Sequence, residues 1–292
     1  MLDVETFVKP IGAATALGIL WLIEGVLPMF EGRVNRVRHG LANVVLGVGN
    51  AAIVAVVFAG ATLLVTEWAR EHGIGLLNVF ALPTAVRLTL AVVIFDAWQY
   101  LWHRLNHQIP VLWRFHAVHH ADRAMDASTA LRFHTGEIIL SSTVRLAVIP
   151  ILGMTVGEVL VYESVLLPII LFHHSNVSMP NRVDTWFRWL IVTPWMHWVH
   201  HSSYQPETDS NYSSIFSFWD RLFGSFRLRA DADEIQLGLE NMRQSEWADL
   251  RGMLTMPFRR DLVRRDRGRR LPDAGEDRHR RSERHAAARY LL

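Results

Sequence analysis

The sequence predicts an all-α integral membrane protein, a helical bundle with a histidine-rich cap at one end. Two observations carry this prediction. Apolar runs of about 20 residues, the length that crosses a bilayer as a helix, recur along the first 172 residues. Eleven of the 15 histidines lie between His103 and His201, in short clusters that follow or interrupt those runs.

The composition supports the membrane class. Half of the 292 residues are hydrophobic, a fifth are charged, and the mean hydropathy is +0.15 although the C-terminus is rich in arginine. Such a value is unusual for a soluble domain of this length. The chain has no cysteine, which excludes disulfides, thiolate metal sites, cysteine-ligated clusters and cysteine nucleophiles.

Five apolar runs are expected to form helices, and their order sets the bundle. They cover residues 11–30, 41–66, 84–102, 138–153 and 156–172. Pro83 suits the start of the third helix. The last two runs are short and are separated by a break at Gly153–Gly157, so they are expected to form a hairpin that enters the membrane and returns rather than two full spans. Glu24 and Glu163 lie within apolar runs, where an exposed charge is costly, so each should face the interior or pair with an arginine.

The arginines predict the orientation. Arg33, Arg36 and Arg38 follow the first run, whereas the loop after the second run carries Arg70 beside two glutamates. The positive-inside rule therefore places the first loop, and with it every histidine cluster, on the cytoplasmic side. We expect a multi-pass protein, of a bacterial inner membrane, with a cytoplasmic cap.

Three regions follow. Residues 1–83 are expected to hold the N-terminal transmembrane helices, and residues 84–226 a histidine-rich region that includes the membrane hairpin. Residues 227–292 are expected to be a polar, arginine-rich and partly disordered tail. Tryptophans are frequent between residues 179 and 226, which is typical of a lid against lipid headgroups and also of a small soluble core.

The histidines occur in four clusters whose spacing is typical of metal ligands. His103 and His107 are four residues apart at the end of the third run, so both rings share one helix face. Two clusters have the pattern His-x-x-His-His, at residues 116–120 and 197–201, and the fourth contains His173 and His174. Adjacent rings on a helix differ by about 100°, so each triplet can serve two different ions. The sequence therefore predicts a di-metal cap.

Imidazole donors restrict which metal ions this site can bind. Imidazole suits zinc, iron, copper and nickel. Two ions held mostly by neutral donors keep a high positive charge, which favours oxidising chemistry at iron, and zinc is expected to be able to replace iron in vitro. Candidate acceptors that would orient the imidazoles are the carboxylates of Asp96, Asp122, Asp126, Glu137 and Asp220.

These motifs resemble the membrane fatty acid hydroxylase/sterol desaturase superfamily. Besides the histidine order, the likeness includes D-A-W-Q-Y at residues 96–100, A-L-R-F-H at 130–134, H-S-N at 174–176, N-Y at 211–212 and W-D-R-L-F-G at 219–224. It covers about half of the chain. The sequence departs from the pattern at residues 134–137, where H-T-G-E stands for His-Pro-Leu-Glu, and at Ser213, which stands for glycine.

The resemblance implies a membrane enzyme with two iron ions that uses dioxygen to oxidise a lipid. Carried over by position, the metal ligands are His103, His107, His116, His119, His120, His134, His174, His197, His200 and His201, with His173 as an alternative tenth. The substrate would be a fatty acyl chain or sterol entering from the bilayer. Electrons would come from a separate donor protein, and no nucleic acid is expected as a partner.

Two alternatives remain open at this point. Hydroxylation and desaturation share the first hydrogen abstraction, and the sequence does not separate them. A histidine-rich metal transporter or metal-binding protein is the second alternative, although transporters often carry repeats and ligands at mid-membrane. A zinc protease is disfavoured because no metal pair has the His-Glu-x-x-His pattern.

Overall fold

A computed structural model describes residues 4–31, 35–230, 235–243 and 245–259, and within these ranges it contains helices and isolated bridges but no strand. Of the predicted tail, residues 227–292, the part from residue 260 onward lies outside the described residues, whereas Glu240–Met242, Leu250–Thr255 and Met256–Phe258 form short helices. The all-α prediction is confirmed.

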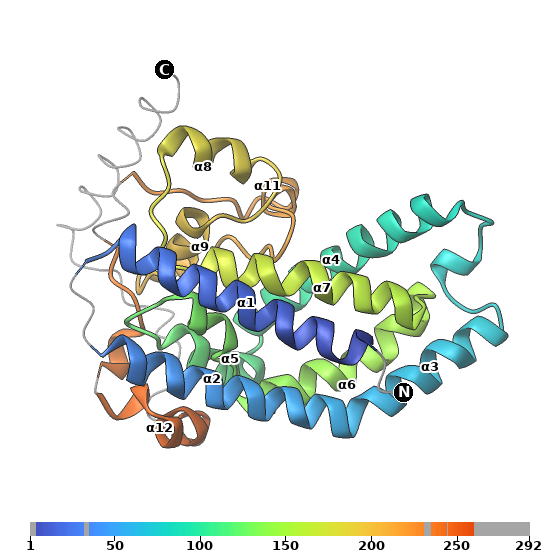
Figure 1. The fold of residues 1–292 in the computed structure, drawn as a ribbon, viewed down its shortest axis with the longest axis horizontal. Coiled ribbons are helices and arrows are strands. Elements are labelled where there is room, and N and C mark those ends of the chain that lie inside the picture. Colours follow the sequence, from blue (N-terminus) through green and yellow to red (C-terminus); the bar gives the residue numbers. More distant parts are fainter. Residues whose placement is uncertain (1–3, 32–34, 231–234, 244, 260–292) are drawn as a thin grey trace.

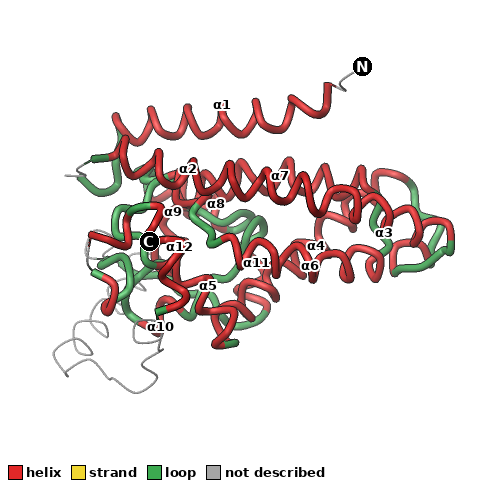
Figure 2. Tube along the Cα trace, turned by 90° about the horizontal axis from the view of Figure 1, so that it is seen from below, coloured by secondary structure: helices red, strands yellow, loops and turns green. Residues whose placement is uncertain are grey.

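Long helices form a bundle (Figures 1 and 2). Helix α1 spans Val4–Val26, and a continuous rod is formed by α2 (Arg36–Ile53), the π-helical turn η1 (Val54–Phe58) and α3 (Ala59–Glu71). After the short η2 (Leu76–Asn78) come α4 (Thr84–Gln108), α6 (Thr135–Leu152) and α7 (Val156–His174).

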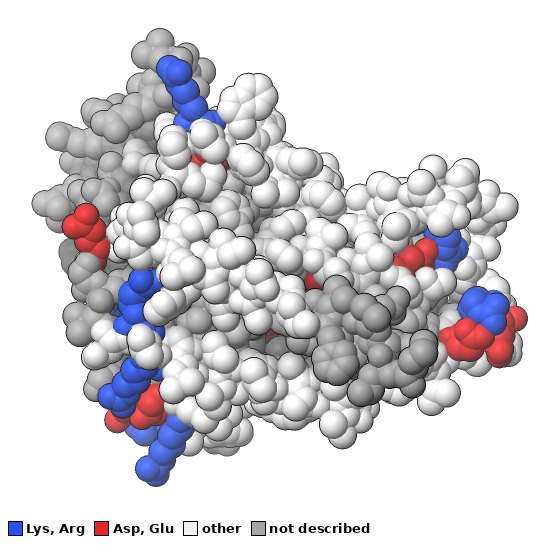
Figure 3. Space-filling view, in the orientation of Figure 1, with Lys and Arg blue, Asp and Glu red and all other residues white. Residues whose placement is uncertain are grey.

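Four segments of the described chain are long and apolar enough to cross a membrane: Arg36–Asn78, Thr84–Gln108, Thr135–Leu152 and Val156–His174. Ile11–Val26 is a shorter apolar helix. Each predicted run thus falls on one of these helices. The predicted hairpin is α6 and α7, and at 1.5 Å per residue each has about the length of the hydrocarbon core. Charged side chains gather toward the two ends of the bundle (Figure 3).

The shorter elements pack at one end of the bundle and form the cap. They are α5 (Pro110–His120), η3 (Ala127–Leu131), α8 (Asn181–Arg188), α9 (Pro194–His200), α10 (Gln205–Thr208), α11 (Phe218–Leu222), η5 (Glu240–Met242), η6 (Ser245–Ala248), α12 (Leu250–Thr255) and η7 (Met256–Phe258). The start of α2, the end of α4, the start of α6 and the end of α7 all contact the cap through polar side chains.

The opposite end of the bundle is closed by two loops in backbone contact. Gly75 and Gly153 have φ of 110° and 75°, and a Cβ on Gly75 would lie 2.2 Å from the Cα of Gly153. Only glycine permits both the positive φ and this approach. Arg87 of α4 joins the loops, because it donates to the carbonyl oxygens of Leu77 and Gly153 and to Glu158.

Both glutamates in the apolar runs pair with arginine, as predicted. Glu163 binds Arg145 at 2.8 Å. Glu24 of α1 is 2% exposed; it accepts hydrogen bonds from the backbone N–H groups of Ala127 (2.8 Å) and Asn176 (2.7 Å) and from Arg36 (3.1 Å). This carboxylate therefore connects α1 to the start of α2, to η3 and to the segment that follows α7.

Removing the Glu24 carboxylate should loosen that connection. Glu24→Ala leaves two buried N–H groups without an acceptor, and we expect the free energy of unfolding to fall by about 3 kcal/mol. Glu24→Gln keeps an oxygen for both N–H groups and should lose less. Thermal unfolding in detergent measures both; Glu67→Ala, which breaks an exposed pair with Arg70, is the control. A wild-type midpoint for Glu24→Ala would contradict this role.

Candidate metal centre

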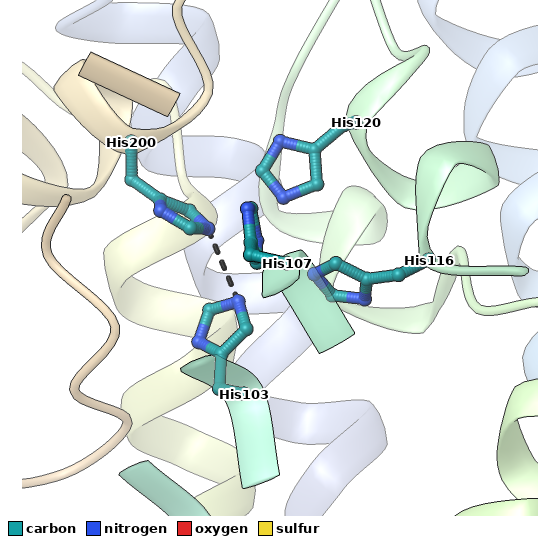
Figure 4. A group of neighbouring side chains, drawn as sticks. All are labelled: His103, His107, His116, His120 and His200. Carbon is teal, nitrogen blue, oxygen red and sulfur yellow. Dashed lines mark hydrogen bonds between the residues drawn. The ribbon is translucent and has the colours of Figure 1, made fainter. Parts of the chain in front are cut away.

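Five of the predicted histidines form one group at the end of α4. His103 and His107 project from the last turns of α4, His116 and His120 from α5, and His200 from α9 (Figure 4). One nitrogen of each ring lies within 4.8 Å of the corresponding nitrogens of the others. Four of the five residues are buried.

Four further histidines form a second group beside the first. They are His119 of α5, His174 at the end of α7, His197 of α9, and His201 directly after α9, and all are buried. The two groups adjoin, because the rings of His120 and His201 stack with centroids 4.4 Å apart. The structure thus brings nine of the ten predicted ligands into two neighbouring groups.

The two His-x-x-His-His triplets are divided between the groups in opposite ways. His116 and His120 enter the five-histidine group while His119 enters the four-histidine group; His197 and His201 enter the four-histidine group while His200 enters the other. The side chains four apart share a helix face, and the adjacent one points elsewhere. Pro110 and Pro194, each in the first turn of its helix, suit the starts of these two short helices.

Backbone carbonyls determine the tautomer of three of these rings. The Nδ1–H groups of His103, His200 and His174 donate to the carbonyl oxygens of Tyr212 (2.8 Å), Ser210 (2.6 Å) and Ile170 (2.7 Å). A carbonyl oxygen only accepts, so Nδ1 carries the proton and Nε2 of the neutral ring holds a bare lone pair.

Those lone pairs face one another. Nε2 of His103 lies 3.1 Å from Nε2 of His200, and Nε2 of His174 lies 3.0 Å from that of His119 and 2.9 Å from that of His197. Nε2 of His116 and of His120 is buried without a hydrogen-bond partner. Converging bare donors repel each other and leave buried polar atoms unsatisfied unless a cation lies among them. The donor set therefore fits one metal ion in each group.

Burial keeps these rings neutral, which is the form that binds metal. It lowers the pKa of His200 to about 3, and together with the neighbouring imidazoles it holds the pKa values of His119, His120, His197 and His201 well below the ordinary value. The charged form of each ring is disfavoured chiefly because water is excluded.

Asn211 directs two of the carbonyls. Its φ is 52°, a left-handed conformation that asparagine tolerates. Its amide donates to the carbonyl oxygens of Met196 (2.9 Å) and Arg227 (2.7 Å), and its Oδ1 accepts from the Arg227 N–H. The carbonyls on either side of Asn211, those of Ser210 and Tyr212, are the ones that orient His200 and His103.

The five candidate carboxylates differ in what they contact. Glu137 contacts a grouped histidine directly, because His116 Nδ1 lies 2.8 Å from its carboxylate. Asp220 and Asp96 instead accept from the backbone N–H groups of residues 212–213 and 215–216, so they hold the loop whose Tyr212 carbonyl orients His103. Asp122 and Asp126 bind His39, which belongs to neither group.

His134 and His173 lie outside both groups. His134 caps α6: its Nδ1 accepts from the Gly136 N–H (2.9 Å) and its Nε2 bonds to the Leu254 carbonyl oxygen (3.2 Å), so both ring nitrogens have partners. His173 is buried, and its ring centroid lies 4.1 Å from that of His197. The departure from His-Pro-Leu-Glu at residues 134–137 thus falls on a histidine that the structure uses as a helix cap.

The sequence analysis missed two contacts of the site. Asp209, whose side chain is 35% exposed, lies 3.5 Å from Nδ1 of His107. The Tyr212 ring makes edge-to-face contacts with the rings of His103, His107 and His200, at centroid distances of 5.8, 5.2 and 5.8 Å. Tyr212 lies in a motif that the analysis singled out, whereas no sequence pattern distinguishes Asp209 from other loop acids.

Comparison with known proteins agrees with this site. Residues 88–225 match the fatty acid hydroxylase family. This segment is just under half of the chain, and the predicted resemblance to that superfamily is confirmed. All nine grouped histidines lie within it.

The curated relatives are lipid hydroxylases and monooxygenases. Ornithine lipid hydroxylase OlsE of Rhizobium tropici is 32% identical over 145 residues, covering 49% of this chain and 43% of that protein. Alkylglycerol monooxygenase of Danio rerio is 29% identical over 155 residues (51% and 32%). Cholesterol 25-hydroxylase of Rattus norvegicus is 27% identical over 167 residues (53% and 52%). The matches thus span about half or less of these relatives. No solved structure matches the chain.

If the two groups each hold one ion, a single substitution should remove about half of the bound metal. We expect this for His200→Ala in the five-histidine group and for His174→Ala in the four-histidine group. His134→Ala is the matched control and should keep its metal, because that ring caps a helix. The test measures the metal content per chain by mass spectrometry after reconstitution with ferrous iron. Unchanged metal content in His200→Ala and His174→Ala would contradict the grouping.

The backbone at Asn211 should also matter for metal affinity. Asn211→Ala removes three hydrogen bonds and strains a left-handed residue, so the carbonyls that orient His103 and His200 would move, and we expect affinity to fall about 10- to 100-fold. Asn211→Gly removes the same hydrogen bonds but adopts the left-handed conformation without strain, so its loss should be smaller. Competition with a chelator measures both; equal affinities for Asn211→Ala and the wild type would refute the role.

Proposed function

We propose that this protein is a membrane-bound di-iron oxygenase that hydroxylates a C–H bond of a lipid, using dioxygen and electrons from a separate protein. The observation that carries the proposal is the convergence of nine imidazoles, eight of them in buried residues, into two adjoining groups in which Nε2 atoms approach one another. The proposed metal ligands are His103, His107, His116, His120 and His200 for one ion, and His119, His174, His197 and His201 for the other.

Iron is the ion proposed for both groups. Bound iron would supply the reductive activation of dioxygen and the abstraction of hydrogen from an unactivated C–H bond. An imidazole donor set without carboxylate ligands leaves the ions strongly positive, which favours oxidising chemistry. Zinc suits the same donors and would replace iron in vitro without this chemistry.

The protein's own groups hold and insulate the ions. The carbonyls of Tyr212, Ser210 and Ile170 keep their rings in one tautomer, and the Glu137 carboxylate accepts a hydrogen bond from Nδ1 of His116. Burial excludes water, which strengthens each of these interactions and protects reactive species from side reactions. The Tyr212 ring contacts three rings of the five-histidine group edge to face.

The position of the histidine groups supports a lipid substrate. They lie at the ends of α4 and α7, two helices long enough to span a membrane, so an acyl chain or sterol could approach from the bilayer. The relatives are named for an ornithine lipid, an alkylglycerol and cholesterol, and the class common to these names is a lipid. A metal transporter would place its ligands near the membrane midplane, whereas these groups lie at the cap.

The orientation and the division of the chain remain part of the proposal. Arg36 and Arg104 lie at the cap end of α2 and α4, whereas the far end of α3 carries Arg70 with Glu67 and Glu71. The positive-inside rule then puts the cap in the cytoplasm, within reach of a soluble or membrane-bound electron donor. Residues 84–226 would be the catalytic region, with 1–83 as the N-terminal helices.

A lipid mass measurement tests the function. The full chain in membranes would be loaded with ferrous iron without oxygen, reduced chemically, and exposed to ¹⁸O₂ with extracted lipids. We expect one lipid class to gain one ¹⁸O atom, because hydroxylation inserts an atom from dioxygen. Loss of two hydrogens without added oxygen would instead show desaturation.

The controls separate chemistry from binding. His200→Ala should abolish the mass change, and zinc-loaded wild type should bind metal without it. If iron-loaded protein modifies no lipid while vesicles containing it accumulate metal, the oxygenase proposal is wrong and transport is supported.

A further inference from the structure

Helix α8, Asn181–Arg188, has its polarity reversed relative to a helix on a water-soluble surface. Asp184 and Arg188 are its buried residues, 1% and 3% exposed, and they form an ion pair with each other. Trp186 and Phe187 are 79% and 49% exposed. Charged residues are almost never buried unless paired, and large aromatic residues normally face a core. This helix therefore presents its apolar face outward.

Neighbouring segments extend this face. Trp189 and Leu190 follow α8 and are 66% and 59% exposed, and Leu222 and Phe223 at the end of α11 are 66% and 50% exposed. We name these residues the apolar ledge: Trp186, Phe187, Trp189, Leu190, Leu222 and Phe223. Contiguous exposed apolar surface of this kind marks an interaction site rather than a surface in water.

The two parts of the ledge are rigidly joined. The Ser217 N–H donates to the Leu190 carbonyl, and the Arg221 guanidinium donates to the Arg188 carbonyl (2.9 Å). The same guanidinium lies 4.8 Å from the Trp189 ring centroid. The ledge is thus one surface of the cap, with an arginine against its aromatic side chains.

The ledge is continuous with the membrane-spanning surface. Phe223 stacks on Tyr100 of α4 with centroids 5.1 Å apart, and Trp219 of α11 donates to Asp96 of α4 (2.9 Å). Leu101, the residue after Tyr100 on α4, is 45% exposed. In the view of Figure 1, α8 and α11 lie on the same side of the cap, at the top.

We propose that the apolar ledge inserts into the headgroup–acyl boundary of the leaflet next to the cap. Tryptophan and an arginine-flanked apolar face are characteristic of segments that lie in the membrane interface. Continuity with α4 favours lipid over a protein partner, because the bilayer that surrounds α4 reaches the ledge without any further component. The inference does not depend on the reaction catalysed.

The absence of cysteine from the sequence allows a direct test. Single cysteines replace Phe187 or Leu222 on the ledge. A cysteine at Val56, which is 85% exposed on the spanning rod, is the lipid reference. A cysteine at exposed Glu240 is the cap reference. Each variant of the full chain carries an NBD fluorophore in phosphatidylcholine nanodiscs. Quenching by iodide, by a lipid with a shallow nitroxide and by one with a deep nitroxide is compared.

We expect both ledge labels to be blue-shifted, weakly quenched by iodide and quenched most by the shallow nitroxide lipid. The Val56→Cys label should respond most to the deep nitroxide, and the Glu240→Cys label to iodide. Iodide quenching of the Phe187→Cys and Leu222→Cys labels equal to that of Glu240→Cys would overturn the proposal. So would protection of the ledge labels from all three quenchers, since a second copy or another protein would then cover the ledge.

Discussion

Nine imidazoles whose nitrogens converge in two groups are the constraint on which the cap depends. In each group the closest Nε2 atoms are about 3 Å apart. Burial holds the pKa values of His200 and His201 below the ordinary value, so protonation of these rings is disfavoured. Other contacts must hold the rings in place. The carbonyls of Ser210, Tyr212 and Ile170 do so, and a cation in each group would turn the repulsion into attraction.

The arrangement follows the distribution of charge along the chain. The spans contain few ionisable groups, and Arg145 and Glu163 of the hairpin pair with each other. At the cap, carboxylates are buried against N–H groups: Glu24 holds α1 to η3 and to the end of α7, and Asp220 and Asp96 hold residues 212–216. A buried carboxylate with several backbone donors is satisfied locally, so these acids set the backbone on which the histidines depend.

Much of this could be predicted from the sequence, for physical reasons that differ between elements. The five apolar runs fall on helices because crossing a bilayer requires length and apolar composition, both of which are local. The division of each His-x-x-His-His triplet follows from helix geometry alone. Helix geometry does not distinguish His134 from His174 as a metal ligand, because their roles depend on partners far away in the sequence. The ring of His134 bonds to the Leu254 carbonyl, whereas the ring of His174 contacts His119. The carbonyls that orient rings carry no residue identity, and the sequence does not reveal them.

The two groups differ in how their rings are held. In the five-histidine group, Nδ1 of His103 and His200 bonds to a carbonyl and Nδ1 of His116 to Glu137, whereas in the four-histidine group Nδ1 of His119, His197 and His201 is buried without a hydrogen-bond partner. Ring stacking replaces those bonds: His119 lies on Phe133 with centroids 4.3 Å apart, and His201 lies on His120. Stacking restrains the ring plane but not the tautomer. Three rings of the five-histidine group are therefore held by directional bonds that define their donor atoms. Among the described contacts of the four-histidine group, only His174, through the Ile170 carbonyl, is held in this way.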